Sequence, residues 1–381
     1  MATVPSPPHL LHAFPTFKVG GAQARFAAIA NHFGRSFRHT LVAMDGQYDC
    51  RERLCPGLLV DYLDPIIRKG RTLANVREFR NVLRATRPGT LVTYNWGSVE
   101  WAMANWPRVA HHVHIEDGFG PEEAQRQFRR RIWTRGLVLA RSTVVVPSLN
   151  LQRIAFRVWK LSPQRVRYIP NGVDCDRFSG PSNISLAATW PGSGLVIGTV
   201  AALRSEKNLT RLLHAFHRVL ARHECRLVIV GDGPERGRLE GLAADLNIAR
   251  RVVFAGYLAS PEAIYRAFDV FALSSDTEQM PYTIIEAMAA GLAIAATDVG
   301  DIRHMVAVEN LPFISPRSDE FLADSLRTLL VDGGARERVG AANRVKARSE
   351  FDQDRMFAAY GALFRGTDPL PIDACISAGR R

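Results

Sequence analysis

Short apolar runs alternate with amphipathic patterns along the first half of the chain. Within residues 21–34, Ala22, Phe26, Ile29 and Phe33 recur at the spacing of one helix face. Between such helical stretches, short runs of β-branched and other apolar residues predict strands at 10–14, 40–43, 58–63, 91–94, 112–115, 143–146 and 166–169. This alternation favours parallel strands with helices on both faces of the sheet.

The same alternation restarts in the second half. A helical face is clear after the first strand of this half, where Leu209, Leu212, Leu213 and Phe216 share one side. Strands are predicted at 195–200, 226–230, 252–255, 270–273 and 292–296. Two such series predict an α/β protein made of two Rossmann-like, doubly wound domains.

The segment 178–194 separates the two series. It is rich in Gly, Pro and Ser and has no strong period, which is typical of a linker. We therefore expect an N-terminal domain at 1–180 and a C-terminal domain at 181–350. A further helix is predicted at 352–365, and it could pack back on the N-terminal domain. A length of 381 residues suits two domains of ordinary size.

Positive charge is concentrated in the first half of the chain. The net charge is +12, and residues 1–180 contain 26 Lys and Arg against 13 Asp and Glu. The remaining residues are close to neutral, with 23 against 24. Such asymmetry indicates an anionic partner for the N-terminal half, which could be membrane lipid, nucleic acid or a phosphorylated substrate.

Composition narrows the cellular setting. No apolar run is long enough to span a bilayer, and the N-terminus lacks a basic region followed by an apolar one, so we expect a cytoplasmic protein. The five cysteines are scattered without a CxxC pair. They are expected to be free thiols, and no metal site is predicted.

The densest candidate chemistry lies in residues 274–291, which read SSDTEQMPYTIIEAMAAG. The segment lies between two predicted strands, and Pro281 suits the first position of a helix that ends at Gly291. Glu278 then lies in the loop at the carboxyl end of a strand, where open α/β sheets bind ligands. Glu286 lies about one turn into the helix.

The start of this helix is a predicted anion site. The main-chain amides around Tyr282 and Thr283 have no partner within the helix and could bind phosphate. The carboxylates of Glu278 and Glu286 cannot bind phosphate, but they can accept hydrogen bonds from sugar hydroxyls. Glu286 could instead be an ordinary exposed carboxylate, although its apolar neighbours count against that interpretation.

The spacing of Glu278 and Glu286, followed by Ala-Met-Ala-Ala-Gly, resembles retaining glycosyltransferases of family 4 (glycosyl transferases group 1). The resemblance implies the GT-B fold, in which two Rossmann-like domains face a cleft. It also implies that Glu278 contacts the donor hexose and that Glu286 binds the ribose hydroxyls of the nucleotide. The neighbouring residues Met280, Tyr282 and Thr283 are then expected to line the donor site.

Further segments match the same family in its order, which makes chance agreement improbable. They are Gly20-Gly21, 169–174 (IPNGVD), 198–208 (GTVAALRSEKN), 227–234 (LVIVGDGP) and 253–256 (VFAG). The resemblance implies that Lys207 supplies a cation for the diphosphate and that Gly231 and Gly233 belong to the donor site. Gly20 and Gly21 resemble the N-terminal glycine turn, where a diphosphate could approach the backbone, although a plain turn fits equally well.

The phosphate-binding stretch departs from the family at one position. The family carries an arginine five positions before the lysine, and Ala202 stands there in this chain. Arg204, two residues later, either substitutes for that arginine or leaves one phosphate contact missing. We therefore include Arg204 among the candidate donor-binding residues.

Ionisable residues also gather after a predicted strand of the N-terminal half, in 111–120 (HHVHIEDGFG). His114, Glu116 and Asp117 are candidates to orient an acceptor hydroxyl or to take its proton. The predicted catalytic residues are His114 and Asp117 together with Glu278 and Lys207. At least one histidine of this segment is expected to be a buried packing residue instead. Asn95, after another strand, is a weaker candidate.

The segment 126–135 mixes five arginines with Phe, Ile and Trp. It resembles a basic interfacial helix that would hold the protein at an anionic membrane, peripherally on its inner face. An arginine-rich helix face exposed to solvent is the competing interpretation, and the sequence leaves both open.

The sequence therefore predicts a retaining glycosyltransferase that moves a hexose-type sugar from a nucleotide sugar to a glycan or lipid-linked acceptor, in cell-surface polysaccharide or glycolipid synthesis. The nucleotide sugar is a substrate, its base is undefined, and no cofactor is expected. A nucleic-acid partner would not explain Glu278 and Glu286. A sugar-nucleotide epimerase and a non-catalytic partner subunit of a glycosyltransferase stay open as alternatives.

Overall fold

A computed structural model describes residues 6–367, apart from 69, 124–125, 182–185 and 188. The chain forms two compact units. Unit 1 comprises Met1–Pro170 with Met356–Arg381, and unit 2 comprises Asn171–Arg355. Residues 171–178 group with unit 2 because α6 (Cys175–Phe178) contacts helices of that unit. The boundary therefore precedes the Gly-, Pro- and Ser-rich segment at which the sequence suggested it.

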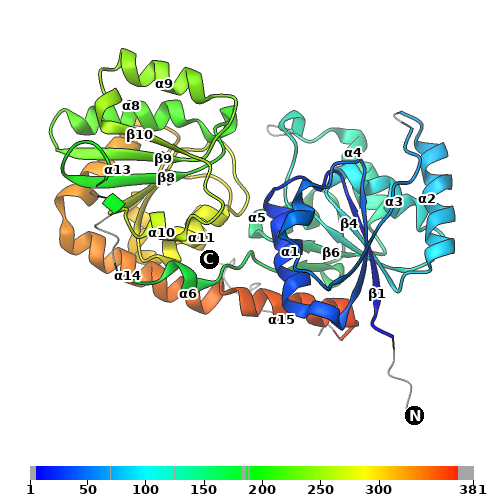
Figure 1. Ribbon diagram of the computed structural model, residues 1–381. Coiled ribbons are helices and arrows are strands. Elements are labelled where there is room, and N and C mark those ends of the chain that lie inside the picture. Colours follow the sequence, from blue (N-terminus) through cyan, green and yellow to red (C-terminus); the bar gives the residue numbers. More distant parts are fainter. Residues whose placement is uncertain (1–5, 69, 124–125, 182–185, 188, 368–381) are drawn as a thin grey trace, which may run out of the picture. The chain divides into compact units, whose positions relative to one another are not determined.

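Unit 1 is built on a parallel sheet with helices on both faces (Figure 1). In spatial order the strands are β3 (Leu59–Tyr62), β2 (Arg38–Ala43), β1 (His9–Phe14), β4 (Thr90–Tyr94), β5 (His111–Ile115), β6 (Thr143–Val146) and β7 (Val166–Tyr168). The helices are α1 (Gly21–Phe33), α2 (Thr72–Thr86), α3 (Val99–Ala104), α4 (Arg129–Val138), α5 (Leu149–Arg157) and, from Met356 onward, α15 (Gln353–Arg365). The chain order reverses between β1 and β4, which is the switch point where such sheets bind ligands.

Alternating side chains of β1 divide the core of unit 1 between the two sheet faces. Leu10 and Phe14 join a cluster with α1 and α15, whereas Leu11 and Ala13 join a cluster with α2 and α3. The last helix, α15, packs on the first of these faces, where Phe357 stacks on His32 with ring centroids 4.2 Å apart.

Unit 2 repeats the architecture with a second parallel sheet. Its strands in spatial order are β10 (Val252–Gly256), β9 (Cys225–Val230), β8 (Leu195–Val200), β11 (Val270–Leu273), β12 (Ala293–Thr297) and β13 (Ile314–Ser315). Its main helices are α8 (Leu209–Leu220), α9 (Arg236–Asp245), α10 (Glu262–Tyr265), α11 (Tyr282–Ala289), α12 (Ile302–Met305), α13 (Asp319–Val331) and α14 (Gly333–Glu350). The switch point lies between β8 and β11, beside α11.

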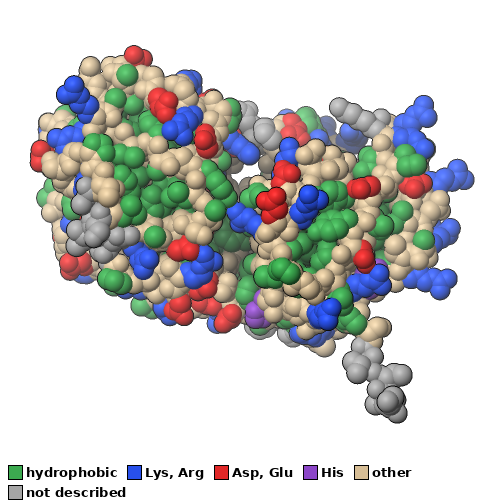
Figure 2. All heavy atoms as spheres, viewed as in Figure 1, with side chains coloured by type: hydrophobic (Ala, Val, Ile, Leu, Met, Phe, Trp, Pro, Cys, Tyr) green, Lys and Arg blue, Asp and Glu red, His purple; other side chains and the backbone are tan. Residues whose placement is uncertain are grey.

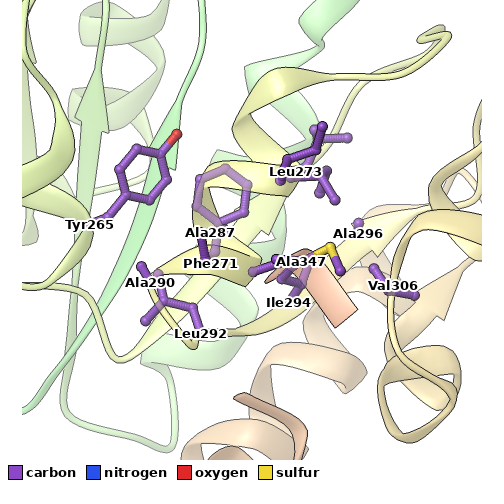
Figure 3. Packing of buried hydrophobic residues seen from close by; sticks show 14 of the residues in the cluster. Tyr265, Phe271, Leu273, Ala287, Ala290, Leu292, Ile294, Ala296, Val306 and Ala347 are labelled. Atoms are coloured by element: carbon purple, nitrogen blue, oxygen red, sulfur yellow. The ribbon is translucent and has the colours of Figure 1, made fainter. Parts of the chain in front are cut away.

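The core of unit 2 brings α11 onto the sheet. Figure 3 shows Phe271 of β11 and Ile294 of β12 packed near Ala287 of α11 and Ala347 of α14. Every predicted strand is present, and the two parallel sheets confirm the predicted α/β fold with two Rossmann-like units. The sequence did not predict β13, a strand of two residues.

Candidate functional site

The central loop of the candidate site connects β11 to α11. Pro281 is the residue just before α11, with φ −70° and ψ 127°, so the helix begins at Tyr282, one residue later than the sequence suggested. Glu278 lies in this loop, and Glu286 follows one turn into the helix. Tyr282 and Thr283 occupy the first turn of α11, where the main-chain N–H of Ile284 donates to Pro281 O over 3.2 Å.

Lys207 and Glu278 are in direct contact. Lys207 Nζ donates to Glu278 Oε1 over 2.6 Å, and Ser275 Oγ donates to the same oxygen over 2.7 Å. Both side chains of the ion pair stay partly accessible, with exposed fractions of 25% for Lys207 and 10% for Glu278. A cation and a carboxylate that the sequence separates by 71 residues therefore form one site.

Several side chains lock the lysine loop to the glutamate loop. Asp276 accepts hydrogen bonds from Asn208 Nδ2, at 3.0 Å, and pairs with Arg211 at 2.7 Å. Ser274 Oγ donates to the main-chain oxygen of Lys207 over 3.1 Å. Sequence reasoning missed Asp276 and Arg211, because their pairing depends on which strands are neighbours and leaves no local pattern.

Gly231 and Gly233 pack directly against the main chain of the phosphate-binding stretch, residues 198–208. A Cβ at Gly231 would lie 1.9 Å from the carbonyl oxygen of Ala201, and one at Gly233 would lie 2.5 Å from that of Leu203. The main chains of the two segments are bonded as well, since Leu203 N donates to Asp232 O over 3.0 Å. These two positions require glycine because only a missing side chain allows so close an approach.

Arg204 lies next to the position at which the family arginine is missing. Its main-chain N–H donates to Ala202 O over 2.9 Å, so the two residues share one tight turn. The side chain of Arg204 is exposed, and no hydrogen bond or ion pair joins it to another described residue. Its guanidinium could therefore reach an anion, and its role as a substitute stays a prediction.

Glu286 is held by a buried tyrosine. Tyr265 Oη donates to Glu286 Oε2 over 2.5 Å. Burial raises the pKa of Glu286 to about 7, the hydrogen bond from Tyr265 works in the opposite direction, and the charge of Glu262 adds to the rise. Sequence reasoning missed Tyr265, because it precedes Glu286 by 21 residues and belongs to a different helix.

Met280 faces the protein interior. Its sulfur accepts a hydrogen bond from Asn171 N over 3.3 Å, and its carbonyl oxygen accepts one from Asn171 Nδ2 over 2.9 Å. The side chain is 5% exposed, so any contact of Met280 with a donor would have to come from its main chain.

Gly300, which the sequence did not single out, packs on the loop that contains Glu278. A Cβ at Gly300 would lie 2.5 Å from Glu278 O.

The polar cluster of unit 1 is only partly accessible. His114 is 1% exposed, its Nδ1 lies 2.8 Å from Thr93 Oγ1, and its Nε2 lies 3.5 Å from Glu116 Oε2. His112 is buried too, between Thr93 and Ser142. Both are thus the buried histidines that the sequence allowed for, and His114 could affect an acceptor only through its neighbours.

Asp117 is the accessible member of this cluster. Arg25 of α1 donates to both of its carboxylate oxygens, over 2.6 and 2.9 Å, and Asn95 Oδ1 accepts from Asp117 N over 2.7 Å. Asn95 has φ 53°, a conformation that is sparsely populated without glycine. Gly21 is the first residue of α1, the helix that carries Arg25, and Gly20 precedes it in an extended conformation. Sequence reasoning missed Arg25.

The basic segment turns two of its arginines inward. Arg131 donates to Glu122 and Glu123 over 2.8 and 3.0 Å, and the buried Arg135 donates to Glu116 Oε2 over 3.1 Å. The other arginines, 126, 129 and 130, are exposed on or beside α4. The helix expected over 126–135 begins instead at Arg129 and continues to Val138, and it offers fewer free charges than the sequence suggested because Arg131 and Arg135 are paired.

The described part of the chain contains no cluster of three or more His, Cys, Asp or Glu side chains that could hold a metal ion. Among the same residues, no helix is both long enough and apolar enough to cross a bilayer.

Both units match families of known proteins. Residues 186–346 match the family described as glycosyl transferases group 1, and residues 19–177 match the one described as glycosyltransferase family 4. The chain is 27% identical over 290 residues to the sulfoquinovosyl transferase SQD2 of Arabidopsis thaliana, a match covering 72% of this chain and 54% of that protein. It is 34% identical over 185 residues to a GDP-mannose-dependent alpha-mannosyltransferase of Mycolicibacterium smegmatis, covering 46% and 44%. The matches thus cover less than two-thirds of the length of these curated relatives.

Solved structures share the fold over nearly the whole chain. HepE of Anabaena in complex with UDP has a TM-score of 0.79 at 19% identity, over 94% of this chain and 100% of that one. A sucrose-phosphate synthase of Thermosynechococcus elongatus has a TM-score of 0.77 at 19% identity, over 94% and 98%. These likenesses confirm the GT-B fold, and together with the two family matches they confirm the resemblance seen in the sequence. The chain belongs to the family 4 glycosyltransferases of GT-B fold.

Proposed function

We propose that the protein transfers a hexose-type sugar from a nucleotide sugar to a glycan or lipid-linked acceptor, with retention of anomeric configuration. The observation that carries this proposal is the 2.6 Å contact between Lys207 and Glu278 in the loop that leads to Glu286. This arrangement puts one cation and two carboxylates around the N-terminus of α11. A nucleotide sugar needs both kinds of group, because it combines a diphosphate with two sets of hydroxyls.

Each group of unit 2 has one task in the proposed reaction. Lys207, together with the positive end of the α11 dipole, offsets the negative charge that grows on the leaving diphosphate. Glu278 accepts hydrogen bonds from hydroxyls of the donor sugar, and Glu286 accepts them from the ribose. HepE has been solved with UDP and with UDP-glucose, which supports a nucleotide sugar as the donor here.

The acceptor is proposed to bind on unit 1. Asp117 is the group suited to orient an acceptor hydroxyl, since the bidentate contact with Arg25 fixes its carboxylate while 20% of the side chain stays exposed. Each carboxylate oxygen has a second lone pair that can still accept a hydrogen bond. His114 precedes Asp117 in the chain and is buried. It is proposed to affect the acceptor only through its contact with Glu116.

We further propose that α4 docks on an anionic membrane surface. Its exposed side combines Arg129 and Arg130 with Trp133 and Leu137, whose exposed fractions are 80% and 81%. Arginine with exposed tryptophan and leucine suits the boundary between headgroups and acyl chains of anionic lipid. A lipid-linked acceptor in a cell-surface pathway would lie at such a surface.

A panel of UDP-, GDP- and ADP-sugars, tested by thermal shift and then by calorimetry, checks the donor proposal. We expect one nucleotide class to stabilise the protein and to bind with a stoichiometry of one. Absence of binding to every member would contradict the proposal and favour a non-catalytic subunit. Release of an epimerised nucleotide sugar without any acceptor would instead favour an epimerase.

A further inference from the structure

Tyr265 is the last residue of α10 and lies wholly inside unit 2. Its ring is packed against those of Phe178, Phe268 and Phe271, with centroids 5.5, 5.9 and 5.7 Å away. Figure 3 shows Tyr265 and Phe271 in this cluster. This packing leaves the ring little freedom, so the direction of its hydroxyl is fixed. The hydroxyl donates to Glu286 Oε2, and Oε1 of Glu286 has no hydrogen-bond partner among the described residues.

We propose that Tyr265 is a positioning residue for nucleotide binding: its hydroxyl fixes the Glu286 carboxylate and stabilises the ionised form, so that Oε1 can accept from the ribose. The inference rests on the proposed function, because it assumes that Glu286 meets a ribose. A carboxylate that is free to rotate would lose side-chain entropy on binding, whereas one already held by a rigid ring would lose less.

The groups around Glu286 make its ionisation sensitive to this one hydrogen bond. Glu262, also on α10, opposes the charge on Glu286, but it is itself paired with Arg177 of α6 over 2.5 Å. On α14, Arg344 donates to the main-chain oxygen of Ala290 and not to Glu286. Among the described residues of these packed helices, Tyr265 is thus the donor that stabilises the Glu286 carboxylate.

Removing the hydroxyl should raise the pH at which Glu286 loses its proton. Burial already raises the pKa of Glu286 to about 7, and the Tyr265 hydrogen bond lowers it. In Tyr265→Phe the lowering contribution is lost, so the pKa should rise by about one unit. The ionised fraction at pH 7 should then fall about fivefold, and with it the affinity for the donor.

The test is the pH profile of nucleotide-sugar affinity, measured by calorimetry from pH 6 to 9 with the nucleotide sugar that binds the wild type best. A nucleotide sugar serves as the probe because both of its phosphates are esterified and keep their charge over this range. We expect the affinity of the wild type to fall below about pH 7, and the midpoint of Tyr265→Phe to lie about one pH unit higher. Tyr48→Phe is the matched control, since Tyr48 Oη also donates to a carboxylate, that of Asp64 over 2.9 Å, but in unit 1.

A double-mutant cycle separates positioning from a general loss of structure. If Tyr265 acts through Glu286, Tyr265→Phe should weaken binding in the wild type but change nothing in the Glu286→Gln background. The 2′-deoxy form of the same nucleotide should likewise lose less affinity on Tyr265→Phe than the ribose form. A structural defect would weaken binding in every background and of both nucleotides equally, which would overturn the inference.

Different results would overturn the role of Tyr265 and the proposed function. An unchanged pH midpoint in Tyr265→Phe, with a wild type that binds nucleotide sugar, overturns only the role of Tyr265. A wild type that binds no nucleotide sugar at any pH overturns the proposed function and this inference with it.

Discussion

At the scale of single residues, Glu286 carries the proposed contact with the nucleotide. Glu286→Gln should weaken nucleotide binding by about 1–3 kcal/mol, because an amide offers one accepting oxygen where a carboxylate offers two charged ones. Calorimetry with UDP, GDP and ADP measures the loss, and Glu320→Gln on the exposed start of α13 is a control of equal charge change. Unchanged affinity for all three nucleotides would remove Glu286 from the site.

Lys207 and the displaced Arg204 can be distinguished by their effects on turnover. Lys207→Ala should lower the rate of transfer far more than it lowers stability, since the cation offsets charge that grows on the leaving diphosphate. Arg204→Ala should give a smaller loss, of the order expected for one exposed phosphate contact. Full activity of Arg204→Ala beside an inactive Lys207→Ala would show that Arg204 does not replace the arginine missing at Ala202.

At the scale of elements, the phosphate-binding stretch depends on the glycine turn behind it. Gly233→Ala should lower the free energy of unfolding by about 1–3 kcal/mol, because its Cβ would press on the main chain of Leu203. Gly241→Ala is the control: it lies in the middle of α9 with open space around it, so it should raise stability by up to about 1 kcal/mol. Urea unfolding measures both.

The same two glycine variants can also be compared by their affinity for nucleotide. Gly233→Ala should also weaken nucleotide binding, since Leu203 and Lys207 belong to one short loop, whereas Gly241→Ala should leave affinity unchanged. A Gly233→Ala variant that unfolds more easily but binds as tightly as the wild type would mean that the turn does not set the position of Lys207.

The element scale also marks how far the sequence could predict the structure. Strands were predictable because their apolar runs are short and bounded by turn residues. The spatial order of the strands, and with it the two switch points, was not predicted, because it depends on pairing between distant segments. The position of Glu278, in the loop between a strand and the helix that carries Glu286, was predictable because all of these elements lie in one continuous segment. The family resemblance implied that Lys207 and Glu278 belong to one donor site, but their direct contact was not predicted, because it depends on the pairing of β8 with β11. The Tyr265 and Arg25 contacts depend on packing between helices and leave no pattern in the sequence.

At the scale of the whole molecule, positive charge is exposed on at least two helices of unit 1. Figure 2 shows Lys and Arg side chains gathered over the edge of the unit formed by α2, where Arg71, Arg77 and Arg84 are exposed. A second group, Arg126, Arg129 and Arg130, lies at α4 beside Trp133 and Leu137. Only the α4 group combines arginine with a tryptophan that is 80% exposed. The two groups therefore form a matched pair for testing the membrane proposal.

Replacing arginines 126, 129 and 130 by Gln should reduce binding to phosphatidylglycerol-containing vesicles at least about tenfold at about 0.1 M salt. Arg131 is left in place because its ion pairs with Glu122 and Glu123 hold it to the protein. The same change at Arg71, Arg77 and Arg84 should have a smaller effect, and Trp133→Ala should weaken binding without changing the charge. Cosedimentation measures all three variants. Equal losses from the two arginine triples would indicate general electrostatic attraction, and no wild-type binding at any salt concentration would refute membrane docking.

The most direct test of the account is transfer itself. The protein is incubated with a nucleotide sugar that is labelled in its sugar, together with a lipid and glycan extract. Chromatography follows the label, and NMR gives the anomeric configuration of the labelled sugar. We expect the label to move into a glycan or lipid-linked product with the configuration it had in the donor, and this transfer to disappear in Lys207→Ala. Label that stays on the nucleotide, or a product of inverted configuration, would contradict the proposed reaction.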